Sequence, residues 1–167
     1  NPPLVNSAVS ITKMEVWVTN VGISANSEAR NVIGFMDLGE KNTYDPILNS
    51  ILTDPFPDNS SNDLYAKMSA DPLVREYTSA SGQLINNYNY SAGTNFNKIE
   101  NARKLRASEY TYHSQLGYIS LNRKMEADEV LAVAYQYTVR GQSKIYSVGE
   151  FSNEVSNVIS SVYLKML

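Results

Sequence analysis

Histidine and cysteine are the side chains that most often perform nucleophilic catalysis or hold transition metals, and this sequence has almost none of them. His113 is the single histidine, and there is no cysteine. The absence of cysteine excludes thiol catalysis, disulfides and cysteine-ligated zinc. A lone histidine cannot form a His–His metal pair, and nothing in the spacing identifies the serine and carboxylate that a triad needs. Because His113 lies between two tyrosine-bearing segments, we interpret it as a turn or surface residue.

Oxygen ligands are more plentiful, and they gather in one polar segment. Asp54, Asp58 and Asp63, with Asn59 and Asn62, carry the carboxylate and amide oxygens that Ca²⁺ prefers. Their spacing does not match an EF-hand loop, and roles in turns and helix caps explain each of them. No carboxylate pair stands out as a glycosidase pair, and the common nucleotide, hydrolase and metalloprotease motifs do not occur. The sequence therefore predicts no enzyme, with no catalytic residue, no cofactor and no metal site.

Aromatic side chains in the centre of the chain are the candidate for binding. Tyr77, Tyr88, Tyr90 and Phe96 lie in or beside a glycine- and asparagine-rich stretch. If exposed, they form a possible interaction surface, because exposed aromatics stack on sugars or anchor protein interfaces. The alternative, which we favour, is that they pack under a loop as a small satellite core. Trp17 is interpreted as a core or inter-domain packing residue.

A long strand is the element around which these residues must be arranged. Residues 129–139 alternate strictly between bulky and small or polar side chains, the pattern of an extended strand with two different faces. The bulky set is Leu131, Val133, Tyr135, Tyr137 and Val139, and the other set is Ala132, Ala134, Gln136 and Thr138. About eleven residues is long for a strand, so we expect this one at the centre of a sheet.

Further strands are predicted on both sides of it. A hairpin is expected from residues 110–112 and 118–121, and another strand from 143–151 follows the short turn after the long strand. Near the N-terminus, residues 11–19 alternate and residues 31–38 are more continuously apolar. We expect these two segments to pair with each other as antiparallel strands.

The middle of the chain differs from both ends in composition and in expected structure. Residues 43–105 begin with prolines, aspartates and asparagines, which predict irregular structure. Short helices are expected after Ser60 and at Asp71-Pro72, where a capping residue precedes proline at the first helical position. Residues 79–94 are interpreted as loop, and residues 97–104 as a helix with charged pairs at helical spacing.

Together these elements predict an α+β fold, a mainly antiparallel β-sandwich-like sheet with a few short helices in a central insertion. The expected organisation is a linker or lead-in strand at 1–10, one β-sandwich-like domain at 11–152 with its loop and helix insertion at 43–105, and a C-terminal strand or linker at 153–167. With 167 residues, 43% apolar and 19% charged, one domain with a real core is expected. The abrupt ends indicate a domain cut from a longer protein.

Charge and hydropathy exclude two kinds of partner. The formal net charge of −3 argues against nucleic acid, whose phosphate backbone attracts basic proteins. No apolar run approaches the roughly 18 residues that a membrane-spanning helix needs. The domain itself is therefore not expected to span a membrane.

Several segments, taken together and in order, resemble one family. They are EVWVTN (15–20), NVIGFMDLGE (31–40), NDLY (62–65), IENARKL (99–105), SEYTYHSQLGYISLN (108–122), DEVLAVAYQYT (128–138) and YSVGEFS (146–152). Their order is similar to that of the SprA/Sov family, the giant outer-membrane proteins of type IX secretion and gliding motility in the Bacteroidota. The likeness covers most of residues 11–152 and is weakest in the central segment.

The resemblance implies that this chain is one domain inserted between the strands of a large outer-membrane translocon. It implies an outer-membrane-associated location, on the periplasmic or the extracellular side, and brings no catalytic residues. The implied partners are other domains of the translocon, secretion-system subunits or exported substrate proteins. An alternative from the residues themselves is a carbohydrate-binding β-sandwich module at the cell surface, motivated by the loop aromatics.

Overall fold

The computed structural model describes residues 8–20, 28–51, 53–114 and 116–167. Most of the expected lead-in at 1–10, and most of the segment between the first two expected strands, lie outside these ranges. Five strands form the framework: β1 (Val9–Val18), β2 (Arg30–Phe35), β3 (Phe96–Lys104), β6 (Leu131–Val139) and β8 (Val162–Met166).

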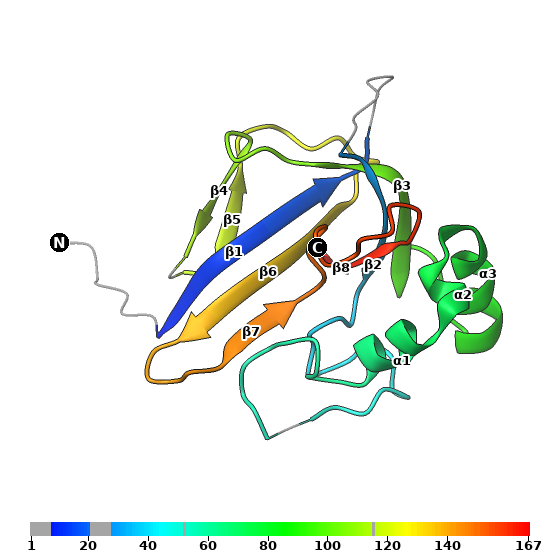
Figure 1. Ribbon diagram of the computed structural model, residues 1–167, viewed down its shortest axis with the longest axis horizontal. Coiled ribbons are helices and arrows are strands. Elements are labelled where there is room, and N and C mark those ends of the chain that lie inside the picture. Colours follow the sequence, from blue (N-terminus) through cyan, green and yellow to red (C-terminus); the bar gives the residue numbers. More distant parts are fainter. Residues whose placement is uncertain (1–7, 21–27, 52, 115) are drawn as a thin grey trace.

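These five strands close on themselves as a barrel. Their order is β1-β3-β2-β8-β6, and β6 pairs back onto β1 (Figure 1). All the pairings are antiparallel except that of β2 with β8. The prediction of a mainly antiparallel β domain with a few short helices is confirmed, but the sheet forms a closed barrel, and a sandwich is not evident. Two of the pairings that close the barrel are short: β1 meets β3 only at Trp17 and Val18, and β8 meets β6 only at Lys165 and Met166.

The alternation of residues 129–139 is confirmed, and the barrel explains it. Ala132 of β6 lies opposite Trp17 of β1, and both are fully buried inside the barrel. Because the indole fills this narrow interior, the facing strand has room only for small side chains, which is why Ala132 and Ala134 alternate with bulky residues. The prediction of Trp17 as a core residue is confirmed. The bulky set of β6 faces the outside of the barrel.

Three short helices cover one side of the barrel: α1 (Leu64–Ala70), α2 (Pro72–Arg75) and α3 (Tyr77–Tyr88). At α2 the predicted cap is confirmed, since the Asp71 carboxylate accepts a hydrogen bond from the Leu73 amide at 3.0 Å. Ser60 is not the cap of α1, whose N-cap position is Asp63 without a side-chain capping bond. The loop expected at 79–94 is wrong over its first part, which belongs to α3.

The helix expected at residues 97–104 is also wrong, and the error has a consequence for the topology. These residues form β3, which lies between β1 and β2 and pairs with both. The expected direct pairing of the first two strands therefore does not occur. Beyond residue 152 the chain continues into β8, which lies between β2 and β6 in the barrel.

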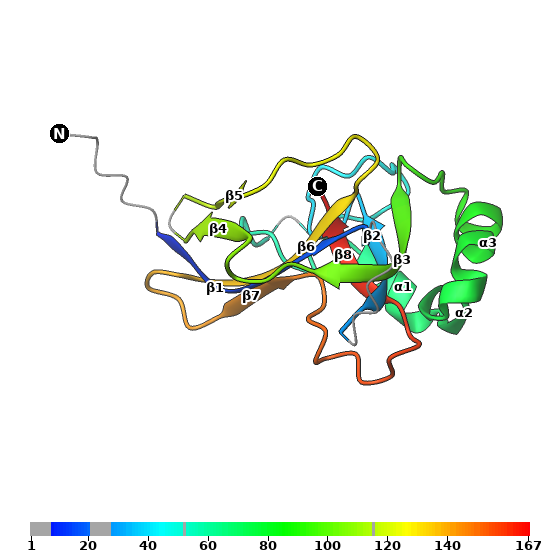
Figure 2. The same cartoon turned by 90° about the horizontal axis from the view of Figure 1, so that it is seen from above.

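Two further elements stand outside the ring of five strands. The predicted hairpin is present as β4 (Tyr110–His113) and β5 (Tyr118–Leu121), and β7 (Ile145–Val148) pairs with the second half of β6. In both Figure 1 and Figure 2 the hairpin and the helices α2 and α3 lie at opposite ends of the molecule. The barrel thus has two different covers.

Candidate interaction site

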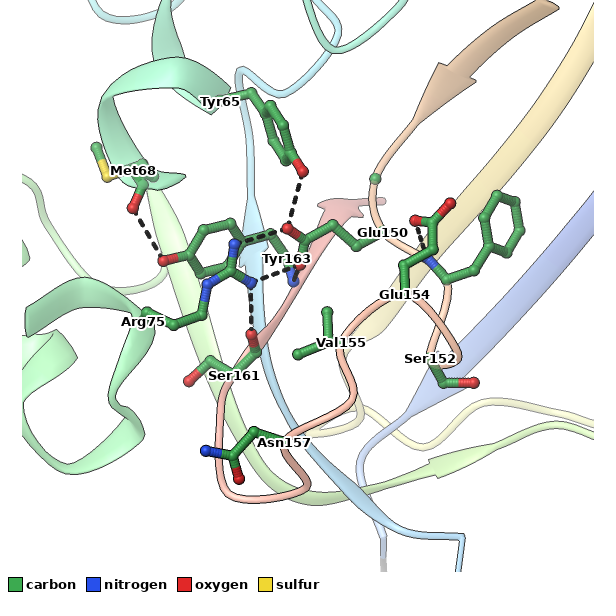
Figure 3. Close-up of polar contacts among 12 residues, drawn as sticks. Tyr65, Met68, Arg75, Glu150, Ser152, Glu154, Val155, Asn157, Ser161 and Tyr163 are labelled. Atoms are coloured by element: carbon green, nitrogen blue, oxygen red, sulfur yellow. Dashed lines mark hydrogen bonds and ion pairs between the residues drawn. The ribbon is translucent and has the colours of Figure 1, made fainter. Parts of the chain in front are cut away.

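The helical cover is fixed to the barrel by one buried carboxylate. Glu150, 4% exposed, accepts hydrogen bonds from the Tyr65 hydroxyl at 2.9 Å and from both terminal nitrogens of Arg75 at 2.7 Å (Figure 3). The backbone amide of Tyr163 donates a further bond at 3.0 Å. Arg75 also donates to the Ser161 carbonyl and lies over the Tyr163 ring, 3.8 Å from its centroid.

The electrostatics of this cluster indicate a structural role. Burial and the neighbouring Glu150 carboxylate raise the pKa of Tyr65 to about 12. Burial, the largest single influence, lowers the pKa of Arg75, but the hydrogen bonds to Glu150 and the charge of Glu150 together with the nearby tyrosines raise it overall. Because protein donors occupy both oxygens of Glu150, the carboxylate is not offered to a substrate. We interpret the cluster as a latch between helices and barrel.

A second polar cluster joins Glu15 of β1, Arg30 at the start of β2 and the loop after β7. The Glu15 carboxylate accepts bonds from the Trp17 indole at 3.2 Å and from the Ser152 amide at 3.0 Å. Arg30 donates to the carbonyls of Ser152 at 3.0 Å and Val155 at 2.8 Å. Burial lowers the pKa of Arg30, and the charge of Glu15 counteracts part of that shift. These groups fasten the 152–157 loop to the barrel.

The open site is an apolar groove of about 640 Å³ on the outer face of β1 and β6. Its floor is the bulky side of the two strands, formed by Val9, Ile11, Met14, Leu131, Val133, Tyr135 and Tyr137. Cross-strand partners keep these residues on one face: Met14 lies opposite Tyr135, and Ile11 lies opposite Tyr137. Ile11 and Met14 are three positions apart, so in a regular strand they would face opposite sides. The register shift between Ile11 and Lys13 inserts one residue and places both side chains on the same face.

The groove has two different walls. One is strand β5, which contributes Tyr118, Ile119 and Leu121. The other is the loop at Phe56 and Pro57, which the Tyr137 hydroxyl holds by donating to the Pro57 carbonyl. The groove therefore runs between the hairpin and this loop.

Charge is nearly absent from the lining. Among the described residues around the groove, the only charged ones are Glu40 and Lys165, which form an ion pair at 2.8 Å. Burial and the negative charge of Glu40 raise the pKa of Tyr135 to about 12. An apolar floor with one neutralised ion pair favours an uncharged, mostly apolar ligand.

The aromatic residues expected as an interaction surface do not line this groove. Phe96 and Tyr90 are buried in the core beneath the helices, 1% and 7% exposed. Tyr88 is half-buried against the same core, and its hydroxyl donates to Asp71 at 2.9 Å. Tyr77 is half-buried with the Lys98 ammonium 3.9 Å from its ring centroid. The structure gathers them around α3, mostly as packing residues, and an interaction surface there stays a prediction.

The groove tyrosines were visible in the sequence only as strand residues. Tyr135 and Tyr137 lie on the bulky face of the predicted strand, where large side chains are usually interpreted as core residues. Their hydroxyls were the one signal in the sequence that this face is not a closed core, because a dry core seldom buries two phenol groups side by side on one strand.

The other candidate residues have local roles. His113 is exposed and stacks on Tyr118 with ring centroids 4.2 Å apart. Asp54 and Asp58 both pair with Lys144, at 2.9 and 3.1 Å, and Asp63 pairs with Lys67 at 2.9 Å. In the part of the chain that the structure describes, no group of three or more acidic or histidine side chains is placed to hold a metal ion.

Comparison of the sequence with protein-family models gave no match, and comparison with curated proteins gave none. Within the described ranges, none of the helices has the length and apolar character needed to cross a membrane.

Proposed function

We propose that this chain is a non-catalytic interaction domain of a SprA/Sov-type outer-membrane translocon, and that the groove on β1 and β6 is its contact surface. The observation that carries the proposal is the groove itself, a mainly apolar hollow between two walls in which the one ion pair, Glu40–Lys165, carries no net charge. Concave, mainly apolar hollows are characteristic of ligand-binding sites.

The resemblance supports the assignment to a translocon, because the resembling segments coincide with the framework. Residues 31–40 and 128–138 supply most of β2 and β6, and residues 15–20 supply the C-terminal end of β1. The partners are other translocon domains, secretion-system subunits or exported proteins, met on the periplasmic or the extracellular side. The two polar clusters support a scaffold rather than an enzyme, since their charged groups are used to join parts of the fold.

Site-specific photocross-linking tests the proposal in the full-length parent protein. The photoreactive residue p-benzoylphenylalanine is introduced in place of Tyr118 in the groove or of Ile85 on α3, two side chains that are equally exposed at 47%. We expect cross-links to translocon subunits or exported proteins from the groove position and few from the helix position.

A companion experiment replaces residues 11–152 of the parent by a flexible linker. Loss of type IX export and of gliding is the expected result. Normal export together with an absence of cross-links at the groove position overturns the proposal. Hydrolase activity of the purified domain that is lost on replacing His113 does so as well.

The carbohydrate-binding alternative receives no support from its own motivating residues. Tyr88 and Tyr90 present no exposed ring pair, because one is half-buried and the other packs in the core.

A further inference from the structure

We infer that the groove takes an extended, uncharged segment of polypeptide that adds to strand β5 as the third strand of the β4–β5 sheet. The inference rests on the proposed function, in that it names the chemistry of the partner at the same groove. It follows from the free edge of β5, from the direction of the side chains beside it and from the lack of net charge.

The hydrogen-bond pattern of the hairpin leaves β5 with unpaired backbone groups on one edge. In the antiparallel ladder, Tyr110 lies opposite Leu121 and Tyr112 lies opposite Ile119. The Asn122 amide donates to the Glu109 carbonyl at 2.9 Å, which makes that pair a hydrogen-bonded one. Since hydrogen-bonded pairs alternate with non-bonded pairs, the N–H and C=O groups of Ile119 and Leu121 point away from β4.

Within the described residues these edge groups meet no other strand or loop. No backbone hydrogen bond joins Ile119 or Leu121 to residues outside the hairpin. The edge strand β7 is different, because the Asn59 amide donates to the Ser147 carbonyl at 2.8 Å and its side chain bonds both backbone groups of Gly149. The edge of β7 is therefore covered by the protein's own loop, whereas the edge of β5 borders the groove.

The side chains of β5 show where an added strand would lie. Ile119 and Leu121 pack toward β1 and β6, in the cluster that contains Val16 and Val133. The hairpin is thus a second layer above the β1–β6 face. A strand added to β5 lies about 4.8 Å farther along this layer, over Tyr135 and Tyr137, with every second side chain directed into the groove.

We infer a polypeptide because its backbone can hydrogen-bond to the edge of β5 while its side chains fill the apolar groove. An acyl chain fills an apolar groove but leaves the amides and carbonyls of β5 without partners. An extended peptide satisfies them and supplies side chains at alternate positions, the mode called β-strand addition. The paired Glu40 and Lys165 leave no free charge in the lining, so the inward side chains are apolar and neutral.

Fluorescence anisotropy of labelled synthetic peptides with the purified domain tests the inference. The probe is a seven-residue capped peptide with valine or leucine at alternate positions and serine or threonine between them. One control has the same composition with the apolar residues adjacent, and a second has N-methyl groups on the edge-facing amides. We expect the alternating probe to bind saturably, and each control to bind at least tenfold more weakly.

Two proline variants locate the site. Ile119→Pro removes an amide that points into the groove edge, and proline is tolerated at such a position of an edge strand. Tyr112→Pro, directly opposite in the hairpin, removes an amide on the outer edge of β4. We expect the first variant to lose at least tenfold in affinity and the second to bind like the unchanged protein, with circular dichroism showing that both remain folded.

The outcomes separate the alternatives even if a variant fails to fold, because the N-methylated peptide needs no variant. Equal binding of the N-methylated peptide overturns strand addition. So does binding of laurate with no binding of any peptide, or a dimer in sedimentation that Ile119→Pro dissociates. If no peptide binds while export still requires the domain, this inference fails and the proposed function stands.

Discussion

The two covers of the barrel are built in different ways. The helices are joined to it by buried aliphatic and aromatic side chains and by the Glu150 latch, with four hydrogen bonds on one carboxylate. The β4–β5 hairpin is joined by half-buried side chains, among them Tyr110, Ile119 and Leu121, and it leaves an open groove beside it.

This difference separates stability from binding. The latched interface contributes to the free energy of unfolding, and both oxygens of its carboxylate are already bonded within the fold. An open groove with an unpaired strand edge costs stability and is the place where another chain can bind. The helical side is therefore expected to respond to mutation through stability, and the hairpin side through binding.

The largest expected effect comes from breaking the latch. Glu150→Ala leaves the Arg75 guanidinium, the Tyr65 hydroxyl and the Tyr163 amide without their acceptor. Removing one partner of a buried ion pair costs about 3–5 kcal/mol. Urea denaturation measures the change, and Lys67→Ala, at the exposed pair with Asp63, serves as control with less than about 1 kcal/mol. Equal effects of the two variants would contradict the latch.

Matched leucine truncations compare the covers directly. Leu84 of α3 is fully buried, whereas Leu121 of β5 is half-buried beside the groove. We expect Leu84→Ala to cost about 2–5 kcal/mol and Leu121→Ala about 1 kcal/mol. Thermal and urea unfolding provide the measurement. A larger loss at Leu121 than at Leu84 would mean that the hairpin, not the helical side, holds the fold together.

Two glycines with positive φ sharpen the comparison further. A Cβ on Gly149, φ +80°, would meet the Val133 carbonyl at 3.0 Å and Ala134 at 3.1 Å, while a Cβ on Gly117, φ +70°, meets nothing within 4 Å. Gly149→Ala is therefore expected to cost at least about 2 kcal/mol, and Gly117→Ala only the backbone cost of about 1 kcal/mol. Similar melting temperatures for the two variants would argue against the crowding at Gly149.

The smallest effect is a pH dependence at the latch. The pKa of Tyr65 lies near 10 in the unfolded chain and is raised to about 12 in the folded one, so the folded protein holds this proton more tightly. The resulting stabilisation is complete below pH 10 and is lost as the pH rises through 12. We expect Tyr65→Phe to cost about 1 kcal/mol at neutral pH and to lose less stability between pH 10 and 12. Urea titrations at stepped pH measure this, and parallel declines would refute it.

Strands with strict alternation were predictable because their pattern is local. The β6 pattern and the β4–β5 hairpin follow from period-two spacing and a short turn, and both are confirmed. The faces of β6 were predictable too, but which face lies inside was not. That depends on Trp17, more than a hundred residues away in the chain, occupying the barrel interior.

Strand β3 was missed for a physical reason. Its buried residues Phe96, Ile99 and Ala102 recur every three positions, a spacing that resembles a helix. Phe96 and Ile99 lie on opposite faces of β3 and are both buried, one beneath the helices and one inside the barrel. Between Ile99 and Ala102 the pairing with β2 is irregular, where Asn101 adopts φ 47° and shifts the alternation by one residue. Helix α3 was missed because its glycine and asparagines are poor helix formers, and burial of Ala80 and Leu84 outweighs that propensity.

The groove could be anticipated only in part. Its floor residues were identified as one face of a strand, but an open groove depends on how far the hairpin stands from the 54–58 loop. That distance is set by contacts between distant segments, such as the Lys144 ammonium with Asp54 and the Tyr137 hydroxyl with Pro57. Local patterns do not specify such contacts.

The place of β8 in the ring has a consequence for biogenesis. It is the last of the five barrel strands along the chain, yet it stands between β2 and β6. Until residues 162–166 are available, β2 and β6 lack their pairing partner at this position of the barrel, and a chain in this state is prone to wrong strand pairings. We expect the protein to need a chaperone during that interval, and a chain stopped at residue 161 to aggregate.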